Sequence, residues 1–264
     1  MEQTLELFRP SHILPPANHL ISDISTACSP HRLNPLVDIN PTSTFFSGEN
    51  LSRVIPNVQH SKPSRDLRLV IHGSAGGEVH HLFKYLVRKV QNLRGTHVDL
   101  EVLTQENPKA SSSSSILLIP LFLLPGKHVQ NDIPKIFRRL SNQGIDTQLV
   151  PFLGSWPYWI SILKYFVNLK SHNEKSILLH HPINSGEYGK SYLENLNRIL
   201  KIPIISWKQW HEFLDNSDRT YTPIPFALAP NKNTKGLRKS DSISSLLEVD
   251  LFMFNLIKIL SIMP

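Results

Sequence analysis

Two histidines stand at positions in the sequence where metal chemistry could occur. His72 ends the apolar run 67–72, and His128 follows the apolar run 115–122 after a short loop. In open parallel sheets, ligands bind at the carboxyl ends of the strands. Two strand-end histidines can converge on one cation there and leave most of its coordination sphere open. A purely structural role for either histidine is the alternative.

The chain offers little other soft metal-binding material. Cys28 is the only cysteine, which excludes a disulfide framework and any cysteine-based zinc or iron–sulfur site. It also suits a reducing compartment. The 13 histidines are therefore the candidates for metal binding. Beside His72, we expect Gly73 and Ser74 to provide room and a hydroxyl, and Gly126 to let the loop before His128 turn toward the site.

The elements that must position these residues alternate along the chain from residue 66. Apolar runs predict strands at 67–72, 96–103, 115–122 and 147–152, and helical periodicity predicts helices at 78–94, about 129–143 and 156–170. Alternating strands and helices predict an α/β unit with a parallel sheet. The connection between the second and third strands is close to the minimum for a parallel crossover.

The second half of the chain resembles a degenerate repeat of the first. Strands are expected at 176–181, 201–206 and 221–229, with a helix at 190–200. Segments 120–127 and 225–232 share Pro, Leu, Pro and Lys in register, which matches His72 with His180 and His128 with Asn233. We therefore predict an α/β fold of two similar doubly wound units, 66–171 and 172–264, with a cleft between them. A chance match between α/β segments is the alternative.

Residues 1–65 are expected to be a Pro-rich, poorly ordered extension. They hold equal numbers of basic and acidic side chains, so the whole formal charge of +7 lies on residues 66–264. The acidic start argues against a transit peptide, although a targeting role is an alternative. No apolar run is long enough to span a membrane. Residues 246–264 predict a packed amphipathic helix rather than an anchor.

Three segments together resemble the sirohydrochlorin chelatases, the class II, ATP-independent chelatases of siroheme and cobalamin synthesis. They are VIHGSAGG (70–77), PLFLLPGKHVQNDIP (120–134) and VPFLGSWP (150–157). The resemblance implies a metal- and proton-handling pair, His72 and His128, in the first unit, with one metal site per chain and a degenerate second unit. It implies insertion of Fe²⁺ into sirohydrochlorin to give siroheme. Insertion of Co²⁺ on the same scaffold, or a non-catalytic tetrapyrrole-binding or metal-binding protein, are the alternatives.

The sequence departs from the family pattern at two residue positions. Members usually carry a glutamate at the end of the second strand, where this chain has Thr104 with Glu101 and Glu106 nearby. A third, acidic metal ligand is therefore in doubt. Trp156 stands where members often have histidine. Asp132, although inside the signature, is expected to cap the following helix rather than to bind metal.

The resemblance implies sirohydrochlorin and a divalent metal as partners, with no cofactor beyond the substrate metal, Fe²⁺ or Co²⁺. Gly73, Ser74, Gly126 and Lys127 are the candidate substrate-binding residues. Substrate carboxylates could also meet His81, Lys84, Arg138 or Lys232. The basic residues form no stripe with interleaved aromatics, so nucleic acid is not an expected partner. We expect a cytoplasmic location, or the plastid stroma if residues 1–65 are a transit segment. The sequence leaves a homodimer open.

Two other motifs carry weaker signals. His80 and His81 are adjacent on a predicted helix, where neighbouring side chains diverge by about 100°, so they are not expected to share one ion. His80 is expected to be solvated. Gly189, Lys190 and Ser191 resemble the end of a phosphate-binding loop, but position 184, where that motif needs glycine, is asparagine. No nucleotide site is therefore expected.

Overall fold

The structure is a computed structural model of the chain. It describes residues 65–74, 77–105, 112–171, 175–183, 186–215, 221–231, 234 and 245–264. The predicted extension therefore lies outside the described residues except for its last residue, Arg65. Glu106, Lys232 and Asn233 also lie outside the described residues. No described helix is both long and apolar enough to cross a membrane.

The first unit is built on a four-stranded parallel sheet in the order β2-β1-β3-β4. Its strands are β1 (Asp66–Ile71), β2 (Val98–Val102), β3 (Ser115–Pro120) and β4 (Asp146–Leu149). The central strands β1 and β3 are buried along almost their whole length, as their apolar sequences predict. Along β1, Leu67, Leu69 and Ile71 enter one core cluster and Val70 enters another, because side chains alternate between the two faces of a strand.

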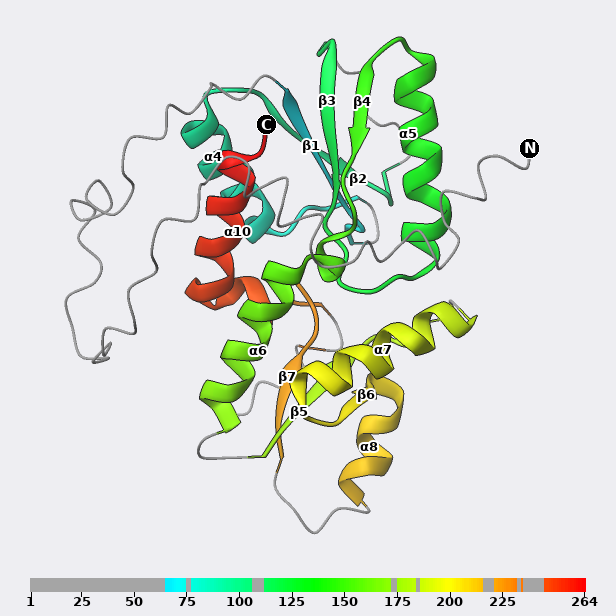
Figure 1. Ribbon diagram of the computed structural model, residues 1–264, viewed down its shortest axis with the longest axis vertical. Helices are drawn as coiled ribbons and strands as arrows, with labels where there is room; N and C mark the ends of the chain where they lie inside the picture. Colours follow the sequence, from blue (N-terminus) through cyan, green and yellow to red (C-terminus); the bar gives the residue numbers. More distant parts are fainter. Residues whose placement is uncertain are drawn as a thin grey trace, which may run out of the picture.

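Two predicted helices of the first unit are present, but each begins three or four residues later than predicted. The helix α4 (His81–Arg94) ends at Gly95, whose φ of 67° provides the left-handed cap. The helix α5 (Ile133–Asn142) follows a π-helical turn over His128–Asp132, so the predicted start near residue 129 is this turn. In Figure 1, α4 and α5 lie on opposite sides of the sheet, as a doubly wound unit requires.

The second unit repeats this plan on a three-stranded parallel sheet in the order β6-β5-β7. Its strands are β5 (Lys175–His180), β6 (Ile204–Ser206) and β7 (Tyr221–Pro225), with helices α7 (Gly186–Leu200) and α8 (Trp207–Asp215). Helix α6 (Pro157–Ser171), the last helix of the first unit, precedes β5. The central strand β5 is flanked by β6 and β7 as β1 is flanked by β2 and β3. Both sheets are parallel, which confirms the predicted α/β class. The helix α8 was not predicted.

Strand register changes one part of the predicted repeat. Pro120 lies opposite Val70 in the first sheet, and Pro225 lies opposite Leu179 in the second. If the two prolines are equivalent, the residue two positions after Val70, which is His72, corresponds to His181. The sequence match of His72 with His180 was therefore wrong by one residue.

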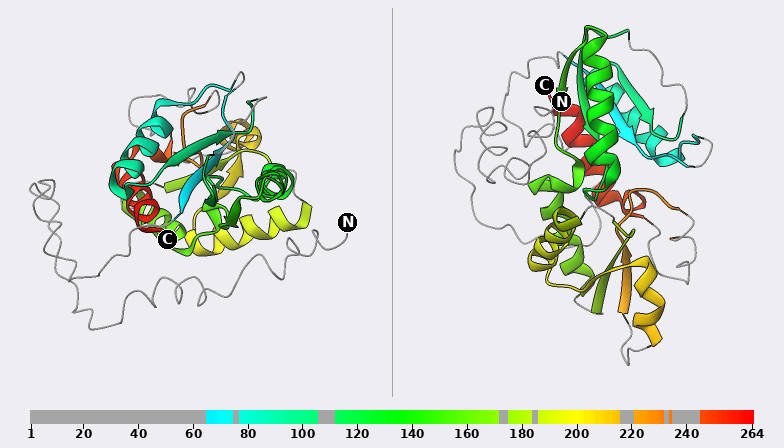
Figure 2. Two further views of the ribbon diagram at one scale, coloured as in Figure 1. Left: turned by 90° about the horizontal axis from the view of Figure 1, so that it is seen from above. Right: turned by 90° about the vertical axis from the view of Figure 1, so that its right-hand side faces the viewer.

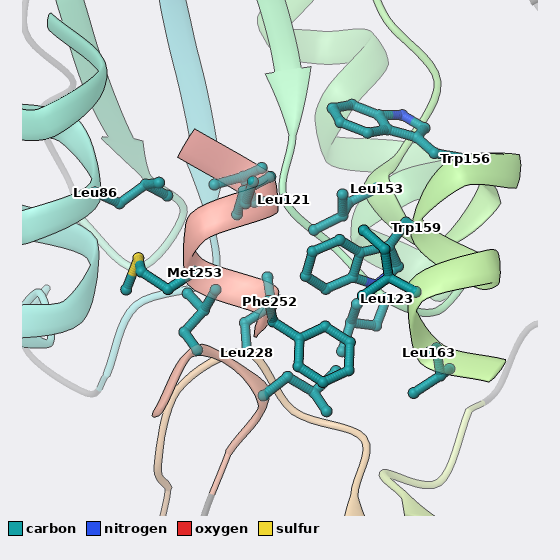
Figure 3. Packing of buried hydrophobic residues seen from close by; sticks show 14 of the residues in the cluster. Leu86, Leu121, Leu123, Leu153, Trp156, Trp159, Leu163, Leu228, Phe252 and Met253 are labelled. Atoms are coloured by element: carbon teal, nitrogen blue, oxygen red, sulfur yellow. The ribbon is translucent and has the colours of Figure 1, made fainter. Parts of the chain in front are cut away.

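The largest hydrophobic core cluster contains residues of both units. The C-terminal helix α10 (Asp250–Ile262) returns from the second half of the sequence and packs beside α4 of the first unit (Figures 1 and 2). Phe252 on α10 contacts Trp159 of α6 (Figure 3), with ring centroids 5.2 Å apart. Its ring centroid is also 5.2 Å from that of Phe166 on the same helix. The sequence boundary between residues 171 and 172 stays a prediction, and α10 packs across it.

Candidate active site

The histidine pair lies at the carboxyl edge of the first sheet. His72 directly follows β1, and His128 opens the π-helical turn that follows the loop after β3. Because β1 and β3 are paired neighbours, the two loops leave the sheet side by side. The imidazole centroids lie 4.6 Å apart, with the rings at 73° to one another. The structure thus brings together the two histidines that the sequence singled out. In Figure 1, the strands of both sheets run toward the boundary between the units, where the sequence predicts a cleft.

The hydrogen bonds of the two imidazoles fix which ring nitrogen carries the free lone pair. His72 Nδ1 lies 2.8 Å from the carbonyl oxygen of Gly73, and His128 Nδ1 lies 2.8 Å from Oδ2 of Asp132. A carbonyl or a carboxylate only accepts, so Nδ1 is the donor in both rings. Each neutral imidazole therefore keeps its lone pair on Nε2, the nitrogen that can bind a metal or accept a proton.

Asp132 has a different role from the predicted one. It occupies the cap position of α5, but its side chain makes no capping hydrogen bond. Its carboxylate instead accepts from His128, and its other oxygen lies 3.6 Å from Lys135 Nζ. The signal was present in the sequence, since side chains four residues apart share one helical face. Phe122 stacks on the His128 ring, with centroids 6.0 Å apart and planes at 24°, so this imidazole is positioned by two neighbours.

Gly73 and Ser74 shape the loop after β1. Gly73 has a φ of +81°, and a Cβ atom there would lie 2.2 Å from Val102 Cγ1. Only glycine fits, because both the backbone conformation and the contact with β2 exclude a side chain. The Ser74 hydroxyl donates to the carbonyl of Glu78 at 3.1 Å, and the Ser74 carbonyl accepts from Thr104 at 2.8 Å. Both residues thus hold the loop beside His72.

Gly126 does not need to be glycine for its backbone conformation. Its φ is not positive, and a Cβ atom there would meet open space, so the expectation that it lets the loop turn was wrong. The neighbouring Lys127 is exposed, and so are His81, Lys84 and Arg138. Substrate contacts by these residues stay predictions, and Lys232 lies outside the described residues.

His80 and His81 also differ from the prediction. His80 is not inside the helix but caps α4, and its Nδ1 accepts from the backbone N–H of Leu82 at 3.4 Å. Its extended backbone lets the two imidazoles approach, with centroids 4.2 Å apart. His80 is therefore a capping residue rather than a solvated one.

Of the two acidic residues close to the family's glutamate position, Glu101 is the one that the structure describes, and it stabilises the fold. Glu101 is buried, and its carboxylate accepts two hydrogen bonds from Arg139 Nη2, at 2.7 and 2.8 Å. Arg68, also buried, lies 3.3 Å from the same carboxylate. Within the described part of the chain, no group of three or more His, Cys, Asp or Glu side chains could hold a metal ion. The site therefore offers two imidazole ligands.

At the position where family members often have histidine, Trp156 packs in the protein interior. Its side chain is buried, and its indole N–H donates to the Pro151 carbonyl at 2.8 Å. Trp159 is fully buried in the core, whereas Tyr158 is about half exposed. These aromatic residues are core or surface residues and offer no metal ligand.

The strand-end histidine of the second unit is held differently from His72. His181 Nε2 lies 3.2 Å from the side-chain amide nitrogen of Asn231. The amide oxygen of Asn231 accepts from the backbone N–H of Thr234 at 3.2 Å, which fixes the orientation of the amide. His181 Nε2 therefore accepts a hydrogen bond where a metal ligand would need its lone pair. The adjacent His180 is buried, and this burial lowers its pKa.

Comparison with known proteins finds one family model that matches the first unit. The CbiX family model matches residues 66–168. No curated protein matches the chain in sequence. Sirohydrochlorin chelatase SirB from Bacillus subtilis subspecies spizizenii, solved in complex with cobalt, is similar in structure, with a TM-score of 0.50 and 15% identity over 75% of this chain and 95% of that chain.

Two further solved structures align less closely. DR2241 from Deinococcus radiodurans, a multi-domain protein with structural similarity to chelatases, has a TM-score of 0.49 and 13% identity over 75% of this chain and 54% of that chain. CbiX, the terminal enzyme for siroheme biosynthesis in denitrifying bacteria, has a TM-score of 0.47 and 14% identity over 66% and 83%. At 15% identity, the likeness to SirB establishes the fold. Residues 66–168, the part of the chain that the CbiX family model matches, carry both histidines and Asp132.

Proposed function

We propose that the protein inserts Fe²⁺ into sirohydrochlorin to form siroheme, without ATP. The observation that carries this proposal is the histidine pair, two imidazoles with centroids 4.6 Å apart whose Nδ1 atoms are both engaged as donors. Two Nε2 lone pairs at one sheet edge suit a divalent ion of the first transition series. The CbiX family match and the likeness to a sirohydrochlorin chelatase support the assignment.

A site with two protein ligands suits a metal that must be passed on. His72 and His128 hold the ion while the macrocycle approaches, and the remaining coordination positions stay open for its four nitrogens. A complete protein cage would compete with the product. The second unit supplies no equivalent pair among its described residues, since His181 Nε2 already accepts from Asn231. We therefore expect one metal per chain.

The same histidines can take the protons that the reaction releases. Each metal insertion breaks two pyrrole N–H bonds and forms two metal–nitrogen bonds, so two protons must leave. As the metal moves to the macrocycle, Nε2 of each imidazole becomes free to accept one proton. The Asp132 carboxylate, 2.8 Å from His128 Nδ1, stabilises the imidazolium that results.

The substrate is a polycarboxylate, which suits the positive charge of residues 66–264. Lys127 is exposed and adjacent to His128, where its ammonium group could meet a substrate carboxylate. Gly126 presents no side chain in front of this position, and a Cβ there would point into open space. Gly73 and Ser74 complete the proposed substrate-binding set on the loop after β1. The ferrous ion and the single Cys28 favour a reducing compartment such as the cytoplasm.

Cobalt insertion is the second candidate, favoured by the cobalt complex of SirB. Two imidazoles do not discriminate between Fe²⁺ and Co²⁺, because selection between such ions depends on geometry and supply. A non-catalytic tetrapyrrole-binding or metal-binding role is the third candidate. It is favoured by Glu101, whose carboxylate accepts from Arg139 and is therefore not free to bind a metal.

Anaerobic incubation with sirohydrochlorin tests these candidates. The purified protein is mixed with the macrocycle and either Fe²⁺ or Co²⁺, and the absorbance change of the macrocycle gives the rate. The proposal expects insertion faster than the spontaneous reaction, with Fe²⁺ faster than Co²⁺ and no effect of added ATP. Faster insertion of Co²⁺ would support the second candidate. Binding of the macrocycle without acceleration would support the third and refute the enzyme.

A further inference from the structure

Tyr192 joins the second unit to the loops of the first unit that surround the histidine pair. It lies on α7, and its hydroxyl is 2.9 Å from two carbonyl oxygens, those of Leu123 and Gly154. Leu123 belongs to the loop after β3, and Gly154 belongs to the loop after β4. One side chain of the second unit thus contacts two adjacent loops of the first.

These two loops are packed closely against each other. The backbone N–H of Gly154 donates to the carbonyl of Phe122 at 2.8 Å. A Cβ atom at Gly154 would lie 2.0 Å from the Leu123 carbonyl oxygen, so only glycine permits the approach. The Tyr192 hydroxyl donates to the carbonyl oxygens of both loops, Leu123 and Gly154, which share its hydrogen. Its ring packs near Phe152, with centroids 5.9 Å apart.

The loop held by Tyr192 is the loop that positions His128. It begins after Pro120, carries Phe122, whose ring stacks on the His128 imidazole, and ends at Lys127. Leu123 is five residues before His128 and directly follows the stacking residue. A shift of the Leu123 carbonyl therefore moves Phe122 and the start of the π-helical turn together.

We infer that Tyr192 is a positioning residue for the proposed chelatase reaction: by tying the loop after β3 to α7, its hydroxyl sets the place of His128 relative to His72. The expected effect on metal insertion rests on the proposed function, whereas the placement of His128 by Tyr192 does not. Burial raises the pKa of Tyr192, so the phenol stays protonated and remains a donor at any physiological pH. The second unit then contributes to the reaction by fixing the histidine geometry, even though the Nε2 atom of His181 already accepts from Asn231.

The test compares Tyr192→Phe with Tyr158→Phe. The substitution Y192F removes the hydroxyl and keeps the ring against Phe152. Y158F is the matched control, since the Tyr158 hydroxyl also joins two helices, donating to Asn255 Oδ1 at 2.7 Å, but does not contact either loop of the site. We expect Y192F to lower kcat for metal insertion about tenfold, as a misplaced catalytic group does, and to leave KM for sirohydrochlorin nearly unchanged.

Two measurements without sirohydrochlorin keep this inference separate from the proposed function. Y192F is expected to shift the ¹⁵N imidazole signals of His128 and to weaken Co²⁺ binding, by about fivefold or more, whereas Y158F changes neither. If wild-type protein fails to insert metal but Y192F shows these changes, the function falls and the positioning role stands. If wild-type protein inserts metal and Y192F matches it in kcat, Co²⁺ affinity and His128 signals, the inference is overturned. Loss of the fold in Y192F, seen by near-ultraviolet circular dichroism, would also overturn it, because the role would then be structural.

Discussion

Replacing Asp132 with asparagine tests how the carboxylate that accepts from His128 Nδ1 contributes to the reaction. The Nδ1–Oδ2 contact is 2.8 Å long, and the two side chains are 42% and 35% exposed. Loss of a carboxylate behind a metal-binding histidine typically costs ten- to a hundredfold in affinity or activity. Because solvent reaches this pair, we expect the lower end, about tenfold in the insertion rate, which corresponds to about 1.4 kcal/mol.

The asparagine variant separates orientation from charge. Its side-chain oxygen still accepts from His128 Nδ1, so the tautomer is kept and Co²⁺ affinity falls less than the insertion rate. Asp132→Ala loses both the acceptor and the charge, so both quantities fall. The two variants are compared by anaerobic insertion kinetics and by Co²⁺ titration of the protein alone.

Asp146→Asn is the matched control for this experiment. Asp146 also pairs with a basic side chain, Arg65, at 2.9 Å, but it lies at the beginning of β4, on the opposite edge of the sheet. We expect this control to insert metal at the wild-type rate. Equal rates for Asp132→Asn, Asp146→Asn and wild-type protein would refute the role given to the carboxylate.

Three further predictions concern the scaffold. Arg94→Ala should lower the free energy of unfolding by about 2–4 kcal/mol, measured by urea denaturation. The reason is that the buried guanidinium donates to the carbonyls of Arg65, Leu260 and Met263. Arg88→Ala, on the exposed side of the same helix, is the control. Gly73→Ala should destabilise the fold and abolish insertion, because the new Cβ would lie 2.2 Å from Val102 Cγ1 and 2.7 Å from Thr104 Oγ1. Adding Val102→Ala removes the shorter of these contacts and should recover part of the stability; equal stability of the single and double variants would contradict this. His180→Ile should make the free energy of unfolding less sensitive to acid. Burial lowers the pKa of His180, so below about pH 6.5 the unfolded chain binds more protons than the folded chain, and the free energy of unfolding of the wild-type protein falls by at most about 1.4 kcal/mol per pH unit until the folded-state pKa is reached. The same pH profile of unfolding in the variant and the wild-type protein would contradict this.

The histidine pair could be predicted because it depends on short-range features of the sequence. The runs before His72 and after Ser115 are apolar and β-rich, and the carboxyl ends of neighbouring parallel strands necessarily lie together. The role of Asp132 was within reach for the same reason, since its spacing from His128 is local. The cap expectation failed because a π-helical turn precedes α5 and leaves the carboxylate facing the imidazole instead of the backbone.

Long-range contacts account for what the sequence did not predict. Nothing in the residues of α10 indicates that it packs beside α4 in the other unit, and nothing in Tyr192 indicates the two carbonyls that it contacts. The register of the repeat also depends on strand pairing, and it moved the counterpart of His72 from His180 to His181. Such features are decided by packing between elements far apart in the chain.

The most direct test of the central claim is the rate of metal insertion in a double-mutant cycle of His72→Ala and His128→Ala. If both imidazoles act on one ion, each single variant falls close to the spontaneous rate, and the double variant falls no further, because residues that act as a unit are strongly non-additive. Circular dichroism should show wild-type folding for all three, since His72 is exposed and neither ring belongs to the core. Wild-type insertion by either single variant, or losses that simply multiply in the double variant, would contradict the account.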